Sequence, residues 1–201
     1  MKNTLAIAVL ALLFWACQNT TSQQETTEEA TEEANEHAHH QTDEKPDETK
    51  KKPKSPKTSA MANIGDNHVH IEYGSPSVRG RVIWGGLVPY GEVWASGAHN
   101  ATSINFGNDV IIGGVEIPKG KYAFFTIPGE KEWTVIINKN WDQHLADKYN
   151  QEEDIVRVTV APQENEFAEA LKYSVVSSDD TKGYINFEWA DLKIALEVVN
   201  N

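Results

Sequence analysis

Apolar and polar residues alternate with a period of two along most of residues 58–201. Successive side chains of a β-strand point to opposite faces of the sheet, so this alternation predicts strands that bury one face. The clearest run covers residues 192–199, where Leu192, Ile194, Leu196 and Val198 fall on one side. The chain is therefore expected to fold as an all-β protein.

Turn signals separate the expected strands. Gly65-Asp66-Asn67 and Gly113-Gly114 each lie between two alternating segments, and such sequences favour the tight turns of β-hairpins. Many short strands joined by turns predict a single β-sandwich or jelly-roll-like domain. The expected strands cover residues 58–64, 68–73, 110–112, 115–117, 121–127, 133–139, 155–160, 171–176, 184–189 and 192–199.

One short helix is expected over residues 140–150. Asn140 is a suitable N-cap, and Gln143 stands three residues later in a capping-box relation. Trp141, Leu145 and Tyr149 follow at intervals of four residues, which places them on one stripe of a helix. We expect this stripe to pack across the sandwich.

The N-terminus has the pattern of a lipoprotein export signal. Lys2 precedes an apolar run from Leu5 to Ala16, which is shorter than the roughly 20 residues that a membrane-spanning helix needs. Residues 12–17, Leu-Leu-Phe-Trp-Ala-Cys, resemble a lipobox, and Cys17 is the only cysteine of the chain. Residues 1–17 are therefore predicted to be a signal peptide that ends at an acylated Cys17, although an ordinary secretory signal with an incidental cysteine is the alternative.

Lipidation at Cys17 would anchor the chain to a membrane, because two or more acyl chains bind a bilayer durably. The two residues after Cys17 are Gln and Asn rather than the Asp that resembles an inner-membrane retention signal. We expect an outer-membrane lipoprotein that faces either the periplasm or the cell surface.

Residues 18–57 contain no Ile, Leu, Val, Phe, Met, Trp or Tyr. A segment with so little to bury cannot offset the entropy of ordering its backbone, so a disordered tether is predicted here. Its Glu-His-Ala-His-His tract at residues 36–40 suits loose metal binding, with solvated polar filler as the simpler interpretation.

The charge and the motifs exclude several functions. A net charge of −12, from 30 acidic and 18 basic residues, argues against nucleic acid as a partner. The sequence lacks the His-Glu-x-x-His, Gly-x-Ser-x-Gly, P-loop and dinucleotide-binding motifs. A cysteine nucleophile is excluded in the folded domain, since the only cysteine belongs to the signal.

Four motifs carry a family resemblance. They are Arg-Gly-Arg-Val-Ile-Trp-Gly-Gly-Leu-Val-Pro-Tyr-Gly-Glu-Val-Trp at 79–94, Gly-Ala-His-Asn-Ala-Thr at 97–102, Pro-Lys-Gly-Lys-Tyr at 118–122 and Phe-Thr-Ile-Pro-Gly at 125–129. Over nearly all of residues 58–201 the chain resembles an uncharacterised family of secreted bacterial β-rich domains, domain of unknown function 2911. The resemblance implies a β-rich fold and an exported protein, but no activity.

Histidines form the first candidate site. His68 and His70 have the i,i+2 spacing that lets two imidazoles on one strand face bind one metal ion. A third ligand would come from Glu72, His99 or His144, and such a set would suit Zn²⁺ or Cu²⁺. The simpler interpretation is the solvated polar face of an amphipathic strand.

Aromatic and basic residues form the second candidate site. If exposed, Trp84, Trp94 and Trp141 could stack on a sugar ring or hold a peptide, although tryptophans of small domains usually lie in the core. Arg79 and Arg81 could bind a carboxylate or phosphate, or else pair with acidic residues of the domain.

Three functions of different class follow. The favoured one is an envelope-anchored lipoprotein whose non-enzymatic β-sandwich binds a small molecule, glycan or protein, with a divalent metal as an optional part of the site. The second is a metal-dependent hydrolase that uses the same histidines with Glu72 as the base. The third is a structural or glycan-binding envelope module that uses the tryptophans.

Overall fold

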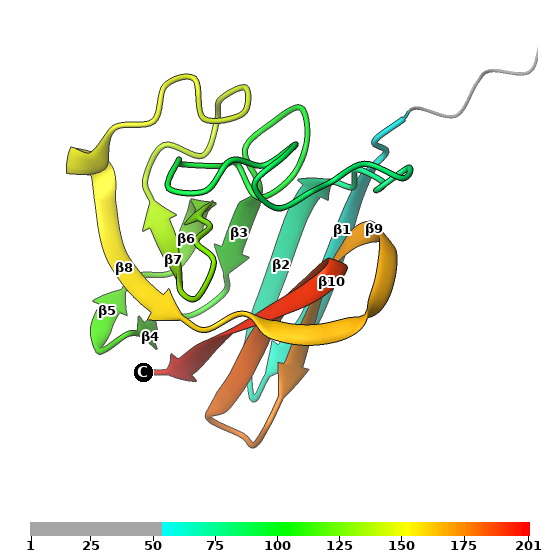
Figure 1. The fold of residues 1–201 in the computed structure, drawn as a ribbon. Coiled ribbons are helices and arrows are strands. Elements are labelled where there is room, and N and C mark those ends of the chain that lie inside the picture. Colours follow the sequence, from blue (N-terminus) through cyan, green and yellow to red (C-terminus); the bar gives the residue numbers. More distant parts are fainter. Residues whose placement is uncertain (1–53) are drawn as a thin grey trace, which may run out of the picture. The chain divides into compact units, whose positions relative to one another are not determined.

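A computed structural model describes residues 54–201 of the chain. The expected signal peptide with Cys17, the tether up to residue 53 and its histidine tract lie outside the described residues. Two antiparallel β-sheets form the fold, which confirms the all-β prediction (Figure 1). The elements are β1 (Lys57–Ile64), β2 (Asn67–Gly74), β3 (Ser103–Phe106), β4 (Val110–Ile112), β5 (Val115–Ile117), β6 (Gly120–Ile127), β7 (Trp133–Asn138), the 3₁₀ helix η1 (Gln151–Glu153), β8 (Asp154–Val160), β9 (Gln163–Ser177) and β10 (Lys182–Asn200).

The first sheet has six strands in the order β1-β2-β3-β6-β7-β8, and the second has four in the order β5-β4-β10-β9. Both predicted hairpins are present. β1 pairs with β2 across the Gly65 turn, and β4 pairs with β5 across Gly113 and Gly114. Both glycines of the second turn have positive φ, 59° and 81°, a conformation that glycine adopts at no steric cost.

The prediction differs from the structure in strand length and in one strand. Residues 184–189 and 192–199 were expected as two strands, but they belong to the single strand β10, whose register shifts around Ala190. Ala190 has a φ of 52°, so the backbone bends at a bulge without ending the ladder. β3 was not expected, although Ile104 and Phe106 alternate with Asn105 in the manner of a half-buried strand.

Aromatic rings fill much of the core between the two sheets. Trp133 of β7 and Trp189 of β10 are fully buried, and Trp84 and Trp94 pack on them from the long connection between β2 and β3. Trp84 lies edge-to-face on Trp133, and Trp94 stacks on Trp189, with ring centroids 4.8 Å and 5.8 Å apart. Each such pair stabilises the fold by about 0.5–1.5 kcal/mol beyond the burial of its area.

Residues 140–150 form turns rather than the predicted helix. Leu145 has a left-handed φ of 46°, which interrupts an α-helix. The backbone groups of Gln143 and Leu145 bond to Ala101 and His99 instead of to their own segment. Tertiary pairing therefore overrides the local helical pattern, and the only helical turn among the described residues is η1, capped by Asn150.

The long connection between β2 and β3 and the one between β7 and β8 lie at the same end of the sandwich, at the top of Figure 1. A second, smaller core lies beneath them on the outer face of the six-stranded sheet. Phe125 and Ile136 are its largest members, and two of the three residues of the predicted apolar stripe, Leu145 and Tyr149, pack against it. Among the described residues, no helix has the length and apolarity needed to cross a membrane.

Candidate functional site

Loops cover one part of the outer face of the six-stranded sheet, and another part is exposed to solvent. The two loops cover β6 and β7, whereas the outward side chains of β1 and β2 are partly or fully exposed. On β2 the outward residues are His68, His70 and Glu72, because Val69, Ile71 and Tyr73 point into the core. A cleft lies where the exposed part of this sheet face meets the edge of the two loops.

The cleft has a volume of about 180 Å³. Its floor comes from the outer face of β1, β2, β3 and β6, and its wall from the two loops. Polar and charged residues outnumber apolar ones in the lining, which consists of Lys57, Glu72, Tyr73, Gly74, Ala98, His99, Asn100, Ala101, Ser103, Lys121, Trp141 and Asp142.

Backbone hydrogen bonds join the two loops that form the wall. The amide of Ala101 donates to the carbonyl of Gln143 at 3.0 Å, and the amide of Leu145 donates to the carbonyl of His99 at 2.9 Å. Asn100 and His144 stand opposite each other in this short antiparallel ladder. The pairing fixes Trp141 and His99 on one continuous wall.

The loop that carries His99 is held directly against β2. The amide of Ala98 donates to the carbonyl of Gly74 at 3.2 Å, and a Cβ on Gly74 would lie 2.1 Å from the carbonyl oxygen of Ala98. This approach requires glycine at position 74 for space rather than for its φ. The loop therefore lies too close to β2 for a side chain at position 74.

Buried hydrogen bonds hold the same loop from below. The carbonyl oxygen of Ser96 accepts from the hydroxyl of Thr102 at 3.0 Å and from the hydroxyl of Tyr173 at 2.8 Å. The Ser96 hydroxyl lies 2.9 Å from that of Thr126. Burial raises the pKa of Tyr173 well above its ordinary value, so this phenol remains a neutral donor. The loop is thus preorganised without a ligand.

Three charged groups interact on the cleft floor. One carboxylate oxygen of Glu72 lies 2.6 Å from Lys121 Nζ, and the other lies 3.2 Å from Lys57 Nζ. These hydrogen bonds, with Lys121 the stronger, hold the pKa of Glu72 below its ordinary value. Lys121 Nζ also lies 4.3 Å from the ring centroid of Trp141, a cation–π contact that joins floor to wall.

The family model described as Protein of unknown function (DUF2911) matches residues 55–198. The chain belongs to this family. The DUF2911 match includes both sheets and every residue that lines the cleft. No curated protein and no solved structure matches the chain.

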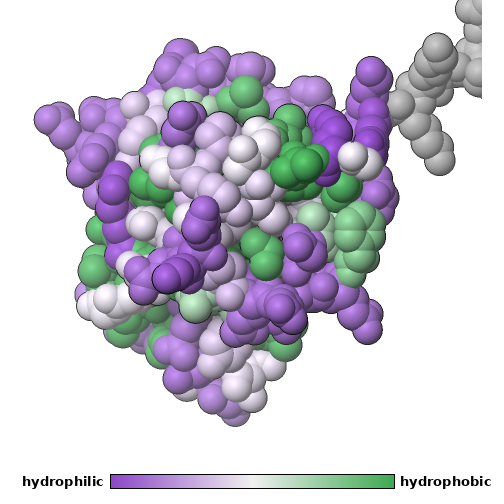
Figure 2. Space-filling model, in the orientation of Figure 1, coloured by the Kyte–Doolittle hydropathy of each residue, from purple (hydrophilic) through white to green (hydrophobic). Residues whose placement is uncertain are grey.

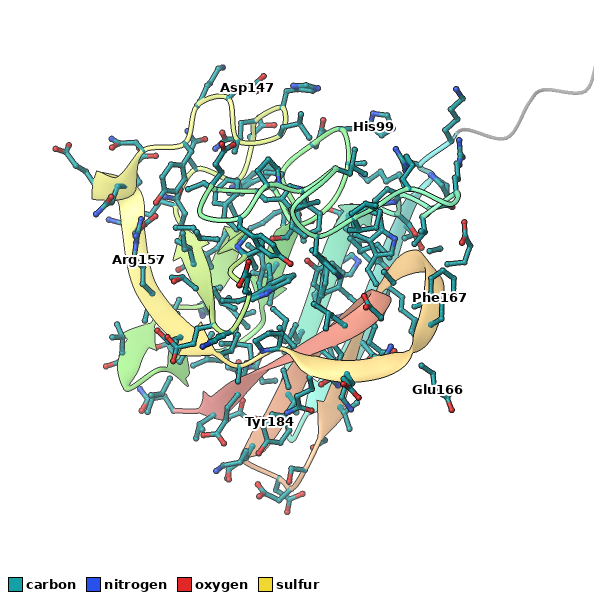
Figure 3. The ribbon with its side chains drawn as sticks, in the orientation of Figure 1. His99, Asp147, Arg157, Glu166, Phe167 and Tyr184 are labelled. Carbon is teal, nitrogen blue, oxygen red and sulfur yellow. The ribbon has the colours of Figure 1, made fainter. Side chains whose placement is uncertain are left out.

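The residues predicted as metal ligands lie on β2 and on the two loops of the DUF2911 fold. His68 and His70 share the outer face of β2, with ring centroids 6.4 Å apart, and His68 is hydrogen-bonded to Asn63. Glu72 is engaged by two lysines, and His99 lies on the wall of the cleft. His144 pairs with Asp147 at 2.8 Å. Figure 3 shows His99 and Asp147 on the loops above the sheets. Within residues 54–201, no three His, Cys, Asp or Glu side chains come together as a metal site.

Of the predicted ligand-binding residues, Trp141 lines the cleft, whereas the two arginines and the other two tryptophans lie outside it. Trp84 and Trp94 pack against the core between the sheets, so they are not the exposed platforms that sugar stacking requires. Arg79 and Arg81 are exposed, and their guanidinium groups donate to the backbone carbonyls of Lys54, Ser77 and Val78. Neither forms an ion pair within the described part of the chain, so the expected pairing with acidic residues is absent for both.

Sequence reasoning predicted Glu72, His99 and Trp141 as candidates but missed the two lysines of the cleft. Lys57 lies at the end of the predicted tether, and Lys121 lies in a predicted strand with no predicted role. Trp141 is predicted on the stripe of a helix or, if exposed, as a stacking surface, and it is 37% exposed at the cleft. The available signal was the motif at residues 97–102, whose Gly-Ala-His-Asn run forms a wall of the site.

Proposed function

We propose that the chain is an envelope-anchored lipoprotein whose β-sandwich domain is a non-enzymatic binding module. Its ligand is a small polar molecule, or a small polar group of a larger one, bound in the cleft. The observation that carries this proposal is the cleft itself, a preformed concave site between a rigid loop wall and a charged sheet floor.

The state of Glu72 favours binding over catalysis. A general base works best when its pKa lies near the operating pH, whereas two lysines hold the pKa of Glu72 below its ordinary value. Lys121 contacts both Glu72 and Trp141, so its ammonium group already has two partners. Glu72 is therefore better suited to hydrogen bonding a ligand than to proton transfer.

A screen of small polar compounds by thermal melting tests the binding module. The full chain in detergent is compared with an Asn100→Trp variant, in which a bulky side chain occupies the exposed wall of the cleft. A ligand that binds only the folded state raises the melting temperature of the parent, and the variant should not respond. Asn63→Trp, on an exposed position of β1, is the matched control. If no compound discriminates Asn100→Trp from the other two proteins, the cleft is not a binding site.

Cys17 carries the envelope part of the proposal. The full chain should incorporate a labelled fatty acid and fractionate with the outer membrane when expressed in a bacterium with two membranes. Cys17→Ser should abolish both properties. Label incorporation that survives Cys17→Ser would contradict anchoring through this residue.

A further inference from the structure

We infer that the ligand of the cleft is a neutral sugar unit, either free or at the end of a glycan. This inference rests on the proposed binding function and specifies its chemical class. It is carried by the charge balance of the cleft, its hydrogen-bonding groups, the exposed ring of Trp141 and the volume.

The charges of the cleft cancel. Lys57 and Lys121 are positive, and Glu72 and Asp142 are negative, so the four formal charges sum to zero with His99 counted as neutral. An anionic ligand would meet two carboxylates, and a cationic ligand would meet two ammonium groups. The site therefore favours neither sign, although the whole chain carries a net charge of −12.

The same groups suit hydroxyls. Each ammonium has three donors, and a carboxylate has about four acceptor positions, of which Glu72 uses only two for its lysines. Asn100 adds an amide that both donates and accepts, and His99 adds ring nitrogens. A sugar hydroxyl is both donor and acceptor, so adjacent hydroxyls can bridge these alternating partners without burying an unpaired charge.

Trp141 supplies the apolar surface that the C–H face of a sugar ring requires. Its indole is partly exposed at the cleft and is held in place by Lys121. The indole ring is apolar but carries a polar N–H, so it suits a sugar, which has hydroxyl groups around an apolar C–H face.

Size and surface character favour one compact group. A cavity of about 180 Å³ is smaller than the roughly 300–1,000 Å³ of sites for drug-sized ligands. On the face of the molecule seen in Figure 2, hydrophobic side chains form separate patches among hydrophilic ones. That face thus offers no single broad apolar surface to compete with the cleft as the recognition site.

Saturation-transfer NMR and calorimetry on the full chain test the inference. The probes are glucose, galactose, mannose and N-acetylglucosamine at about 10 mM, with acetate and ethylammonium as charged alternatives. At least one sugar should bind with a Kd on the order of 1 mM. Trp141→Ala should weaken that binding at least tenfold, and Trp141→Tyr should retain part of it.

Phe167→Ala is the matched control, because Phe167 is an aromatic residue that is 65% exposed. It lies on β9, away from His99 in Figure 3. This variant should bind sugars as the parent does. Trp141-dependent binding of acetate or ethylammonium with no sugar bound would overturn the sugar inference and leave the binding module intact. Sugar binding that is insensitive to Trp141→Ala would also overturn it, as would a complete lack of sugar binding. The compound screen with Asn100→Trp then decides separately whether the cleft binds anything.

Discussion

Gly74→Ala tests how rigidly the wall of the cleft is set. The new Cβ would lie 2.1 Å from the carbonyl oxygen of Ala98, whereas real contacts of this type are essentially never shorter than 3.0 Å. The strand and the loop would have to separate by at least 0.9 Å, the difference between these distances. This movement would stretch the hydrogen bond from the Ala98 amide to the carbonyl of residue 74, which is already 3.2 Å long.

The expected cost follows from these contacts. Overpacking costs about 1–3 kcal/mol, and a lost backbone hydrogen bond costs about 1 kcal/mol more. Alanine offsets about 0.4–1 kcal/mol of this by reducing the entropy of the unfolded chain. The free energy of unfolding should therefore fall by about 1–3.6 kcal/mol. With a urea m-value of about 2 kcal/mol/M, the denaturation midpoint should fall by about 0.5–1.8 M.

Urea denaturation of the full chain, followed by tryptophan fluorescence, measures this shift. Gly80→Ala is the control, because a Cβ at Gly80 meets no atom within 4 Å and only its φ of 67° opposes the change. Gly80→Ala should cost about 1–2 kcal/mol and leave the ligand affinity of the cleft unchanged. Gly74→Ala should lower that affinity as well. A Gly74→Ala chain with the stability and the affinity of the parent would refute the idea that this contact sets the wall.

Three further outcomes are expected. Lys121 and Lys57 lower the pKa of Glu72, so the stability that this group contributes is present above its unfolded pKa and is lost as the pH falls through its folded pKa. The melting temperature of the parent should therefore fall between pH 6 and pH 3, and Glu72→Gln should reduce that fall. At neutral pH, Glu72→Gln should lower the free energy of unfolding by about 0.5 kcal/mol. The raised pKa of Tyr173 predicts the opposite pH dependence: its contribution to stability is complete below the unfolded pKa and falls as the pH rises above about 10. Above that pH, the melting temperature of Tyr173→Phe should depend less on pH than that of the parent. At neutral pH, Tyr173→Phe should lower the free energy of unfolding by about 1–2 kcal/mol, because it removes the hydrogen bond to Ser96. His99→Gly should raise the free energy of unfolding by up to about 1 kcal/mol, since glycine adopts a φ of 70° without strain, and it should weaken ligand binding. A variant that is no more stable than the parent in urea would show that the backbone of His99 is not strained.

The sequence predicted those parts of the fold whose signal is local. The two hairpins depend on glycine turns between alternating segments, and both have the expected partners. The helix over residues 140–150 failed for a nonlocal reason. Its capping and stripe residues are present, but the carbonyl of Gln143 and the amide of Leu145 pair with another loop. No periodicity within eleven residues can reveal a partner more than forty residues away.

The cleft depended on similar long-range information. Alternation correctly placed His68, His70 and Glu72 on one face of a strand. It could not show that Lys57 and Lys121, from strands on either side, would take the carboxylate of Glu72. Nor could it show that the core between the sheets would take Trp84 and Trp94 while Trp141 remained exposed. Residue type and spacing therefore predicted candidates, and strand order decided which of them meet.

Three of the five non-glycine residues with left-handed φ among residues 54–201 lie in the loops that form the wall of the cleft. Ser96, His99 and Leu145 have left-handed φ values of 54°, 70° and 46°, and all three lie in the two loops that form the wall. Each such residue costs about 1–2 kcal/mol, whereas glycine would take the same conformation without that penalty. Strain of this kind persists only where the surroundings over-determine the backbone. Here the close contact of Ala98 with Gly74 and the buried bonds to Ser96 supply that constraint. Of the three, His99 alone lines the cleft and is exposed, so a loop that only closed the end of a sandwich would gain stability from glycine there; the histidine therefore favours a wall shaped for contact with a ligand.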